Sequence, residues 1–358
     1  MDVGIAMGPV PPFAAMERRV HKLAEAGMRS FWWPDHLVAF HSRELWATGQ
    51  LSELQPDPHV YADPFICAAS SARAAGNARI GVCVTDAIRR SAATLLQTAI
   101  SLDHLAPGRV TLGLGAGEYA NYGPYGVEVG SPAAIMESAA AQIRRFLDDP
   151  GPDEHGAVVG IRPPEGSPGP QLWVAAHGPR GFRTAGHYAD GWIPNFLTVD
   201  EWTAGRAAVR SAAEQAGRDP EMLSYGLSVQ VVLADDHDSA AALLNHPVLK
   251  AFALLLPAER FEAVGASHPL GEGGLQHMVA TRAGADQLRA AEAVPFEVVG
   301  EQMLHGTAEE VAATIKQYPG LDHVVLWDPV PLADLSAGRA SAAACARLAA
   351  LLHGEVEP

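Results

Sequence analysis

The chain has 358 residues, 48% of them hydrophobic, and a formal net charge of −16 from 41 acidic and 25 basic residues. A field of this sign repels phosphate backbones, so we expect no nucleic-acid partner. No apolar run reaches about 18 residues and the chain does not begin like a signal peptide, so we expect no membrane segment and a cytoplasmic protein. Three widely spaced cysteines, Cys67, Cys83 and Cys345, fit a reducing compartment without a disulfide framework.

Short apolar runs alternate with segments of helical periodicity along the whole chain. The runs predict strands at 3–7, 30–33, 80–84, 110–115, 172–176, 192–193, 227–233 and 324–327. The helices expected after them lie at about 13–24, 63–75, 95–105, 135–147, 179 onward, 199–216 and 236–244, with a later helix that begins at a Thr307–Glu310 capping box and a closing helix at 341–352.

Eight β–α units predict a single (β/α)8 TIM-barrel domain over residues 1–358. Strands that are apolar throughout are buried on both faces, and the intervening helices make the connections parallel and right-handed. An open doubly wound sheet is the alternative architecture. Residues 245–303, rich in His, Gly and Pro, interrupt the alternation between units seven and eight, and we expect them to form an insertion that acts as a lid over the top face.

Polar residues follow several predicted strands at their carboxyl ends, where barrels of this kind build their active sites. They are Asp35 and His36 after the second strand, Thr85, Asp86, Arg89 and Arg90 after the third, Glu118 and Asn121 after the fourth, and His177 and Arg180 after the fifth. Because the strand ends of a closed barrel share one rim, we expect these side chains to converge on one active site.

Motifs narrow the chemistry further. The glycine run 113–117 is not a dinucleotide fingerprint, because Glu118 occupies the sixth position and a loop follows it; we expect these glycines to let a flat ring lie against the backbone. The sequence has no His-x-His, His-Glu-x-x-His or Gly-x-Ser-x-Gly, so we expect neither a metal site nor a serine nucleophile. Acid/base groups without either of these need a cofactor to carry the chemistry.

Four segments resemble the luciferase-like superfamily of flavin and deazaflavin barrels, and within it the coenzyme F420-dependent oxidoreductases. They are Trp-Pro-Asp-His at 33–36, Gly-Val-Cys-Val-Thr-Asp at 81–86, Leu-Gly-Leu-Gly-Ala-Gly-Glu at 112–118 with Asn121 and Pro-Tyr-Gly at 124–126, and Trp-Val-Ala-Ala-His-Gly-Pro-Arg at 173–180. The last three, with His-Pro-Leu-Gly at 268–271, are most similar to the phthiodiolone ketoreductases of lipid biosynthesis. The resemblance covers residues 1 to about 335.

The resemblance implies coenzyme F420 as cofactor and His36 and Glu118 as the catalytic acid/base residues. It places a non-prolyl cis peptide at Cys83–Val84, behind the cofactor ring. A helix N-terminus offers free N–H groups and a positive dipole, and the helix that begins at Pro179 would hold the cofactor phosphate. The implied cofactor contacts are Asp35, Cys83, Val84, Ala116, Gly117, Asn121, Ala175, Ala176, His177 and Gly178.

Charge and substrate preference follow from the same resemblance. The cations that we expect to offset the phosphate and glutamate tail of F420 are Arg89, Arg90, Arg180 and Arg183. Phe40 stands where the sugar-phosphate-oxidising branch has a tryptophan, and that branch's substrate-phosphate lysines have no convincing match, so we do not expect glucose 6-phosphate as substrate.

Together these features predict hydride transfer between the deazaflavin C5 and a carbonyl, alcohol or activated double bond of an apolar small molecule. The expected walls of the substrate pocket are one of Trp32 and Trp33, because strand alternation turns only one inward, with Phe40, Trp46, Phe252 and Leu254–Leu256. The first alternative is an FMN-dependent luciferase-like monooxygenase, and the second is a barrel that binds a cofactor without catalysis. The family implies a homodimer.

Overall fold

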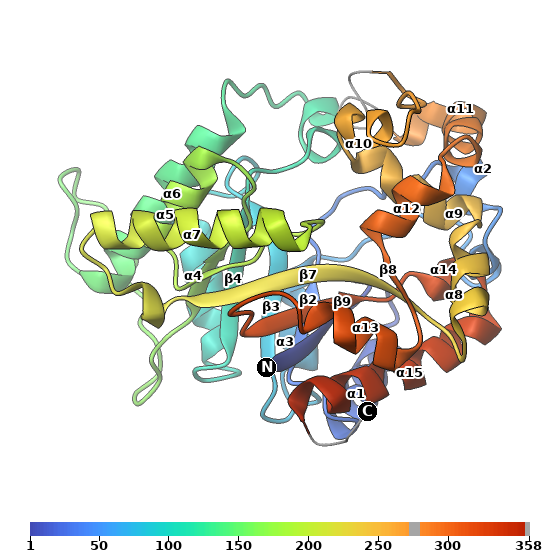
Figure 1. Cartoon of the computed structure of the whole chain (residues 1–358). Coiled ribbons are helices and arrows are strands. Elements are labelled where there is room, and N and C mark those ends of the chain that lie inside the picture. The colour runs from blue at the N-terminus through green and yellow to red at the C-terminus, as the bar shows by residue number, and fades with distance from the viewer. Residues whose placement is uncertain (272–279, 355–358) are drawn as a thin grey trace.

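The computed structural model describes residues 1–271 and 280–354. Eight parallel strands close into a barrel in the order β1–β2–β3–β4–β5–β6–β7–β9, with β9 returning to β1 (Figure 1). They are β1 (Asp2–Ala6), β2 (Ser30–Trp33), β3 (Arg79–Asp86), β4 (Val110–Gly115), β5 (Gln171–Val174), β6 (Gly191–Trp192), β7 (Ser224–Leu233) and β9 (His323–Trp327). The predicted (β/α)8 barrel is confirmed, and the open sheet is wrong.

Helices surround the strands on the outside of the barrel. They are α1 (Phe13–Glu25), α3 (Pro64–Ser71), α4 (Ala92–Asp103), α5 (Pro132–Asp148), α6 (Pro179–Tyr188), α7 (Val199–Gln215), α8 (His237–Leu244), α13 (Ala308–Ile315) and α15 (Leu335–His353). Helix α13 begins with the predicted capping box: the Thr307 side chain accepts from the N–H of Glu310, whose carboxylate accepts from the N–H of Thr307.

A short further strand, β8 (Leu304–Gly306), was not expected from the sequence. It pairs in parallel with Val231–Leu233 and so extends the sheet beside the end of β7, outside the closed barrel. Three residues are too few to show the alternation by which strands are recognised.

Strand alternation divides the large apolar side chains between two layers. On β2, Trp33 belongs to the core between the strands and the helices, whereas Trp32 lies inside the barrel with Trp173, Ile193 and Val325. The rings of Trp32 and Trp173 have centroids 5.5 Å apart. One member of the tryptophan pair therefore faces inward, as the alternation predicts.

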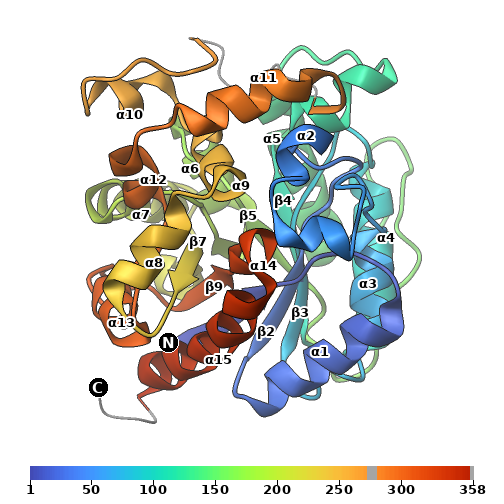
Figure 2. The ribbon, with the colours of Figure 1, turned by 90° about the vertical axis from the view of Figure 1, so that its right-hand side faces the viewer.

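A second hydrophobic core lies beyond the carboxyl ends of β7 and β9. Its helices are α2 (Arg43–Trp46), α9 (Pro247–Lys250), α10 (Ala258–Glu262), α11 (Ala280–Glu292), α12 (Phe296–Gln302) and α14 (Val330–Ala333). Helices α10, α11 and α2 gather at the end of the molecule opposite both termini (Figures 1 and 2). Residues 245–303 supply most of this second core; within them, 272–279 lie outside the described residues. The role of the segment 245–303 as a lid stays a prediction.

Candidate active site

A cavity of about 440 Å³ lies at the carboxyl ends of the strands. The predicted site residues that line it are Asp35, His36, Cys83, Val84, Ala116, Gly117, Glu118, Asn121, Ala175 and His177. Ala176 and Gly178 are not part of its lining. The ends of β2, β3, β4 and β5 thus bring the predicted residues to one place, while the role of each stays a prediction.

The side chain of Asp35 is buried and held on both carboxylate oxygens. Oδ2 accepts from Thr85 Oγ1 at 2.7 Å and from Arg90 Nε at 3.1 Å, and Oδ1 accepts from Arg89 Nη1 at 3.2 Å. Arg89 Nη2 also donates to the main-chain carbonyl of Asp35 at 2.8 Å. These bonds fix both the side chain and the backbone of the residue that precedes His36.

The two arginines after β3 are engaged within the protein. Arg89 Nε donates to Asp86 at 2.7 Å, and Arg90 Nη2 donates to Asp63 at 2.7 Å, in addition to their bonds to Asp35. We expected both guanidinium groups to offset the charge of the cofactor. Three carboxylates balance their charge, and the two arginines join the ends of β2 and β3. Arg89 also lines the cavity, and the role of both residues toward a cofactor stays a prediction.

His36, Asn121 and Glu118 form a compact group on the rim of the cavity. Asn121 Nδ2 lies 3.0 Å from His36 Nδ1 and 3.4 Å from Glu118 Oε2, and His36 Nδ1 lies 3.4 Å from the same Glu118 oxygen. The Tyr61 ring packs edge-on against the His36 imidazole, with centroids 5.6 Å apart. Burial and the nearby Glu118 carboxylate raise the pKa of Tyr61 to about 12, so its hydroxyl stays protonated.

The Cys83–Val84 peptide bond is cis, as the resemblance implied. The glycines of the neighbouring strand β4 leave room for residues 82–84 as well as for the cavity. A Cβ on Gly113 would lie 2.3 Å from the main-chain oxygen of Val82, and one on Gly115 would lie 2.5 Å from Val84 Cγ2. Gly115 lines the cavity but Gly113 does not, so Gly113 is required for close packing of β4 on β3 rather than for contact with a ring.

The end of β5 carries a histidine and an uncapped helix N-terminus. His177 Nε2 and Asn195 Oδ1 are 2.7 Å apart, and desolvation by the surrounding protein lowers the pKa of His177. Gly178 is the N-cap of α6, and no side chain caps the first-turn N–H groups of this helix. The carbonyl of Ala176 accepts from Trp192 Nε1 at 2.9 Å, which explains why Ala176 is absent from the cavity wall.

Aromatic side chains form part of the cavity wall. Trp32, Phe40, Trp46 and Phe252 line it, as expected, together with Trp327. Residues 254–256 do not line it and pack within the second core. The segment 245–303 fixes the backbone of the wall residue Phe40. Buried Gln287 of α11 donates to the carbonyl of Phe40 at 2.6 Å and accepts from the N–H of Ser42 at 2.5 Å.

Two further titratable residues of the cavity were not anticipated. His41 is buried and its ring bonds to the carbonyl of Val248 at 3.1 Å; burial lowers its pKa to about 4. Asp328 follows β9, and burial raises its pKa to about 6. Asp328 stands just past a strand end, as Asp35 and Asp86 do, so its position in the sequence could have pointed to it.

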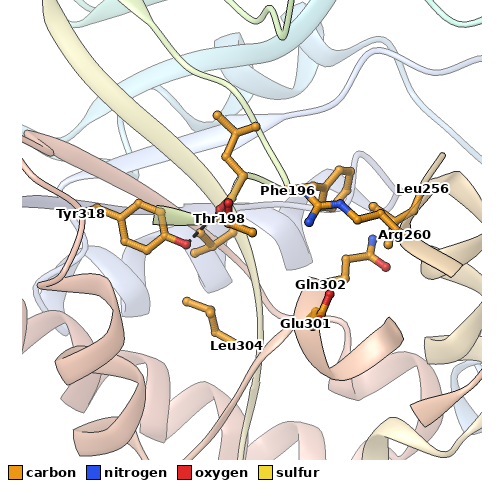
Figure 3. Close-up of a pocket in the computed structure, with 10 residues that line it drawn as sticks. Phe196, Thr198, Leu256, Arg260, Glu301, Gln302, Leu304 and Tyr318 are labelled. Carbon is orange, nitrogen blue, oxygen red and sulfur yellow. Dashed lines mark hydrogen bonds between the residues drawn. The ribbon is translucent and has the colours of Figure 1, made fainter. Parts of the chain in front are cut away.

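A second, much smaller cavity lies between the β6–α7 loop and the segment 245–303 (Figure 3). Its volume of about 30 Å³ suits a water molecule rather than a substrate. The Arg260 guanidinium lies at its edge and bonds to Glu201 at 2.5 and 2.6 Å, and Tyr318 Oη donates to the carbonyl of Leu197 at 2.9 Å. This cavity contains none of the predicted site residues.

Within residues 1–271 and 280–354, no group of three His, Cys, Asp or Glu side chains is placed to hold a metal ion. The same residues include no helix whose length and apolar character would let it cross a membrane.

Comparison with known proteins identifies the family. The family model for luciferase-like monooxygenases matches residues 2–321. The chain belongs to this family. Among its relatives, the phthiodiolone/phenolphthiodiolone dimycocerosates ketoreductase of Mycobacterium sp. (strain JLS) is 34% identical over 336 residues, which cover 89% of this chain and 88% of that protein. This luciferase-like chain is therefore an oxidoreductase.

Solved structures share the luciferase-like fold over almost the whole chain. An F420-dependent secondary alcohol dehydrogenase, solved with an F420-acetone adduct, has a TM-score of 0.75 at 18% identity and covers 98% of this chain and 99% of its own. The oxygenating constituent of 3,6-diketocamphane monooxygenase from Pseudomonas putida, solved with FMN, has a TM-score of 0.68 at 15% identity, covering 100% and 99%. At these identities the likeness establishes the fold alone.

Proposed function

We propose that this luciferase-like protein is an F420-dependent oxidoreductase. It transfers a hydride between the deazaflavin C5 and a carbonyl, alcohol or activated double bond of an apolar small molecule. The observation that carries the proposal is the meeting of His36, Glu118 and Asn121 within 3.4 Å in a cavity whose lining includes several aromatic side chains. The ketoreductase relative and the F420-dependent alcohol dehydrogenase of the same fold support it.

The residues around the cavity fit a flat ring that carries a phosphate. Gly115, Ala116 and Ala175 present little side chain to the space, which leaves room for a planar group. A Cβ added at Gly178 would meet nothing within 4 Å, so the N-terminus of α6 is open to an anion. When bound there, F420 supplies the hydride donor or acceptor that side chains lack.

The chain's own residues then handle the substrate oxygen and the accompanying proton. His36 and Glu118 are the acid/base groups, and Asn121 holds the pair together. Such a group contributes about 10²–10⁴-fold to rate when it is positioned against the reacting atom. Tyr61, uncharged at neutral pH, shields one side of the His36 ring from water.

The aromatic wall favours an uncharged and bulky apolar substrate. Phe40, Trp46, Phe252 and Trp327 bring apolar surface to the cavity, and His41 beside them is neutral at pH 7 because burial lowers its pKa to about 4. Nothing in this wall carries a charge that would attract an anionic substrate. A ketone with a large apolar substituent suits it best.

Binding measurements test the proposal against its alternative. Purified protein is titrated with oxidised F420 and, in parallel, with FMN, while tryptophan fluorescence is followed. Micromolar F420 binding with negligible FMN binding supports the proposal, and ketones are then screened with F420H2. Tight FMN binding would instead favour a luciferase-like monooxygenase, and binding of neither would contradict the site.

A matched pair of variants tests the phosphate position. Gly178→Asp places a carboxylate at the N-cap of α6, where it competes for the N–H groups and repels a phosphate, so we expect weaker F420 binding. Gly160→Asp adds the same charge at an exposed glycine with open space around it and serves as the control. The homodimer and the cytoplasmic location stay predictions.

A further inference from the structure

The orientation of the Asn121 amide is determined by the backbone beside His36. The main-chain N–H of Leu37 points at Asn121 Oδ1, with the nitrogen and oxygen 2.7 Å apart. A backbone N–H can only donate, so the atom that faces it must be the amide oxygen. Asn121 is 2% exposed, and the bond from Leu37 turns its amide nitrogen toward His36.

This orientation constrains the hydrogen on the imidazole. The Asn121 amide nitrogen carries two hydrogens and has no lone pair with which to accept a bond. Its contact with His36 Nδ1, at 3.0 Å, therefore requires that Nδ1 carry no hydrogen. A neutral imidazole must then carry its hydrogen on Nε2, the ring nitrogen that makes no hydrogen bond to the described residues.

The other titratable groups near His36 follow β2, β3 and β4 or precede α3. Glu118, after β4, faces Nδ1 at 3.4 Å and would favour a hydrogen on that nitrogen. Tyr61, before α3, faces the ring and is uncharged at neutral pH. Asp35 precedes His36 and is neutralised by Arg89 and Arg90 after β3. Asn121 lies closer to Nδ1 than Glu118 does and is more deeply buried. The contact with Asn121 therefore determines which ring nitrogen carries the hydrogen.

We propose that Asn121 is a positioning residue that holds His36 in the neutral Nε2–H tautomer. In this tautomer His36 donates a hydrogen bond to a carbonyl oxygen in the cavity and cannot take a proton from an alcohol at Nε2. The proton transfer itself therefore falls to Glu118, and His36 acts by polarising the carbonyl. The site is thereby preorganised to bind a carbonyl substrate. This inference rests on the proposed function only for the identity of the substrate; the tautomer belongs to the chain itself.

Nuclear magnetic resonance of protein labelled with ¹⁵N-histidine tests the proposal without cofactor or substrate. His36 is assigned by the loss of its signals in His36→Gln. In the neutral form of the wild-type His36 ring we expect an unprotonated Nδ1 and a protonated Nε2. A protonated Nδ1 in neutral wild-type His36 would overturn the proposal, whatever the outcome of the F420 titrations.

Asn121→Asp provides the decisive variant because it has nearly the same shape and keeps an acceptor for the Leu37 N–H. Its second carboxylate oxygen would accept from Nδ1, so the hydrogen moves to Nδ1. Asn245→Asp, which adds the same charge at the exposed end of α8, should leave the His36 signals unchanged. An unchanged tautomer in folded Asn121→Asp protein would show that Asn121 does not set it.

Glu118→Gln distinguishes the effect of Glu118 on the His36 tautomer from that of Asn121. If Asn121 sets the tautomer, His36 keeps its hydrogen on Nε2 in this variant. A change of tautomer on removal of the Glu118 charge would assign the control to Glu118 and refute the proposal.

Discussion

Arg89 donates two hydrogen bonds to Asp35: Nη1 lies 3.2 Å from the carboxylate Oδ1, and Nη2 lies 2.8 Å from the main-chain oxygen. The residue held in this way immediately precedes His36. The guanidinium thus connects the end of β3 to the position of a candidate catalytic side chain. It also leaves the arginine without a free charge to offer a ligand.

Replacing this arginine should therefore loosen the site. We expect Arg89→Met to lower the free energy of unfolding by about 3 kcal/mol, because the buried Asp35 and Asp86 carboxylates lose a partner. Urea denaturation measures the change. Arg347→Met removes an exposed pair with Glu309 and should have little effect. Equal stability losses in both variants would contradict the structural role of Arg89.

Glu118 can be tested by an uncharged isostere. We expect Glu118→Gln to lower kcat for hydride transfer by about 10²-fold or more, while the Kd of F420 changes little, since the carboxylate acts on a proton. Stopped-flow measurement of F420H2 oxidation gives the rate, and fluorescence titration gives the Kd. Weakened F420 binding with an unchanged rate would make Glu118 a binding residue instead.

Gly113 should not tolerate a side chain. We expect Gly113→Ala to destabilise the barrel by about 1–3 kcal/mol, because the new Cβ would collide with the main-chain oxygen of Val82. Gly160→Ala, where a Cβ meets open space, is the control. Thermal unfolding of the two variants side by side measures the difference, and a Gly113→Ala protein as stable as wild type would disprove the close packing.

Stability should fall as the pH is lowered from about 6.5 to 4. Burial lowers the pKa of His41 and of His323 from 6.5 to about 4, so both rings must be neutral in the folded state. Their contribution is present above pH 6.5 and is lost as the pH falls, on the order of 3 kcal/mol each. Asp328, whose pKa is raised to about 6, acts in the opposite direction.

Denaturation across this pH range measures the slope. His323→Asn removes one of the two histidines, so the free energy of unfolding should depend less steeply on pH in this variant. A slope identical to that of the wild type would show that His323 is not neutral and buried in solution.

Gln287 links the segment 245–303 to the substrate wall. We expect Gln287→Leu to cost about 1–3 kcal/mol of stability, because the N–H of Ser42 and the carbonyl of Phe40 lose their partners. The KM for bulky ketones should rise, since Phe40 is no longer fixed. Gln215→Leu, at an exposed position on α7, is the control. An unchanged KM in Gln287→Leu would show that the hydrogen bonds of Gln287 to Phe40 and Ser42 do not affect substrate binding.

The sequence predicted the barrel strands because each is a buried apolar run. It also predicted that the polar residues after four of these runs converge, and residues from all four line one cavity. It could not predict β8, whose three residues show no alternation. Nor could it predict that Arg89 and Arg90 form ion pairs with Asp35, Asp63 and Asp86, because these side chains meet only in the folded chain. The pattern of apolar and polar residues places a residue at the carboxyl-terminal rim of the barrel, but the hydrogen-bond partner of its side chain depends on tertiary contacts.

The neutralised guanidinium groups of Arg89 and Arg90 also bear on how a ligand arrives. An anionic cofactor that approaches a chain of net charge −16 is repelled at long range, and these two residues offer it no unbalanced positive charge. Dissolved ions screen such repulsion over about 10 Å at 0.1 M ionic strength. Raising the ionic strength should therefore speed the association of F420, the reverse of the behaviour of enzymes that steer their ligands by attraction.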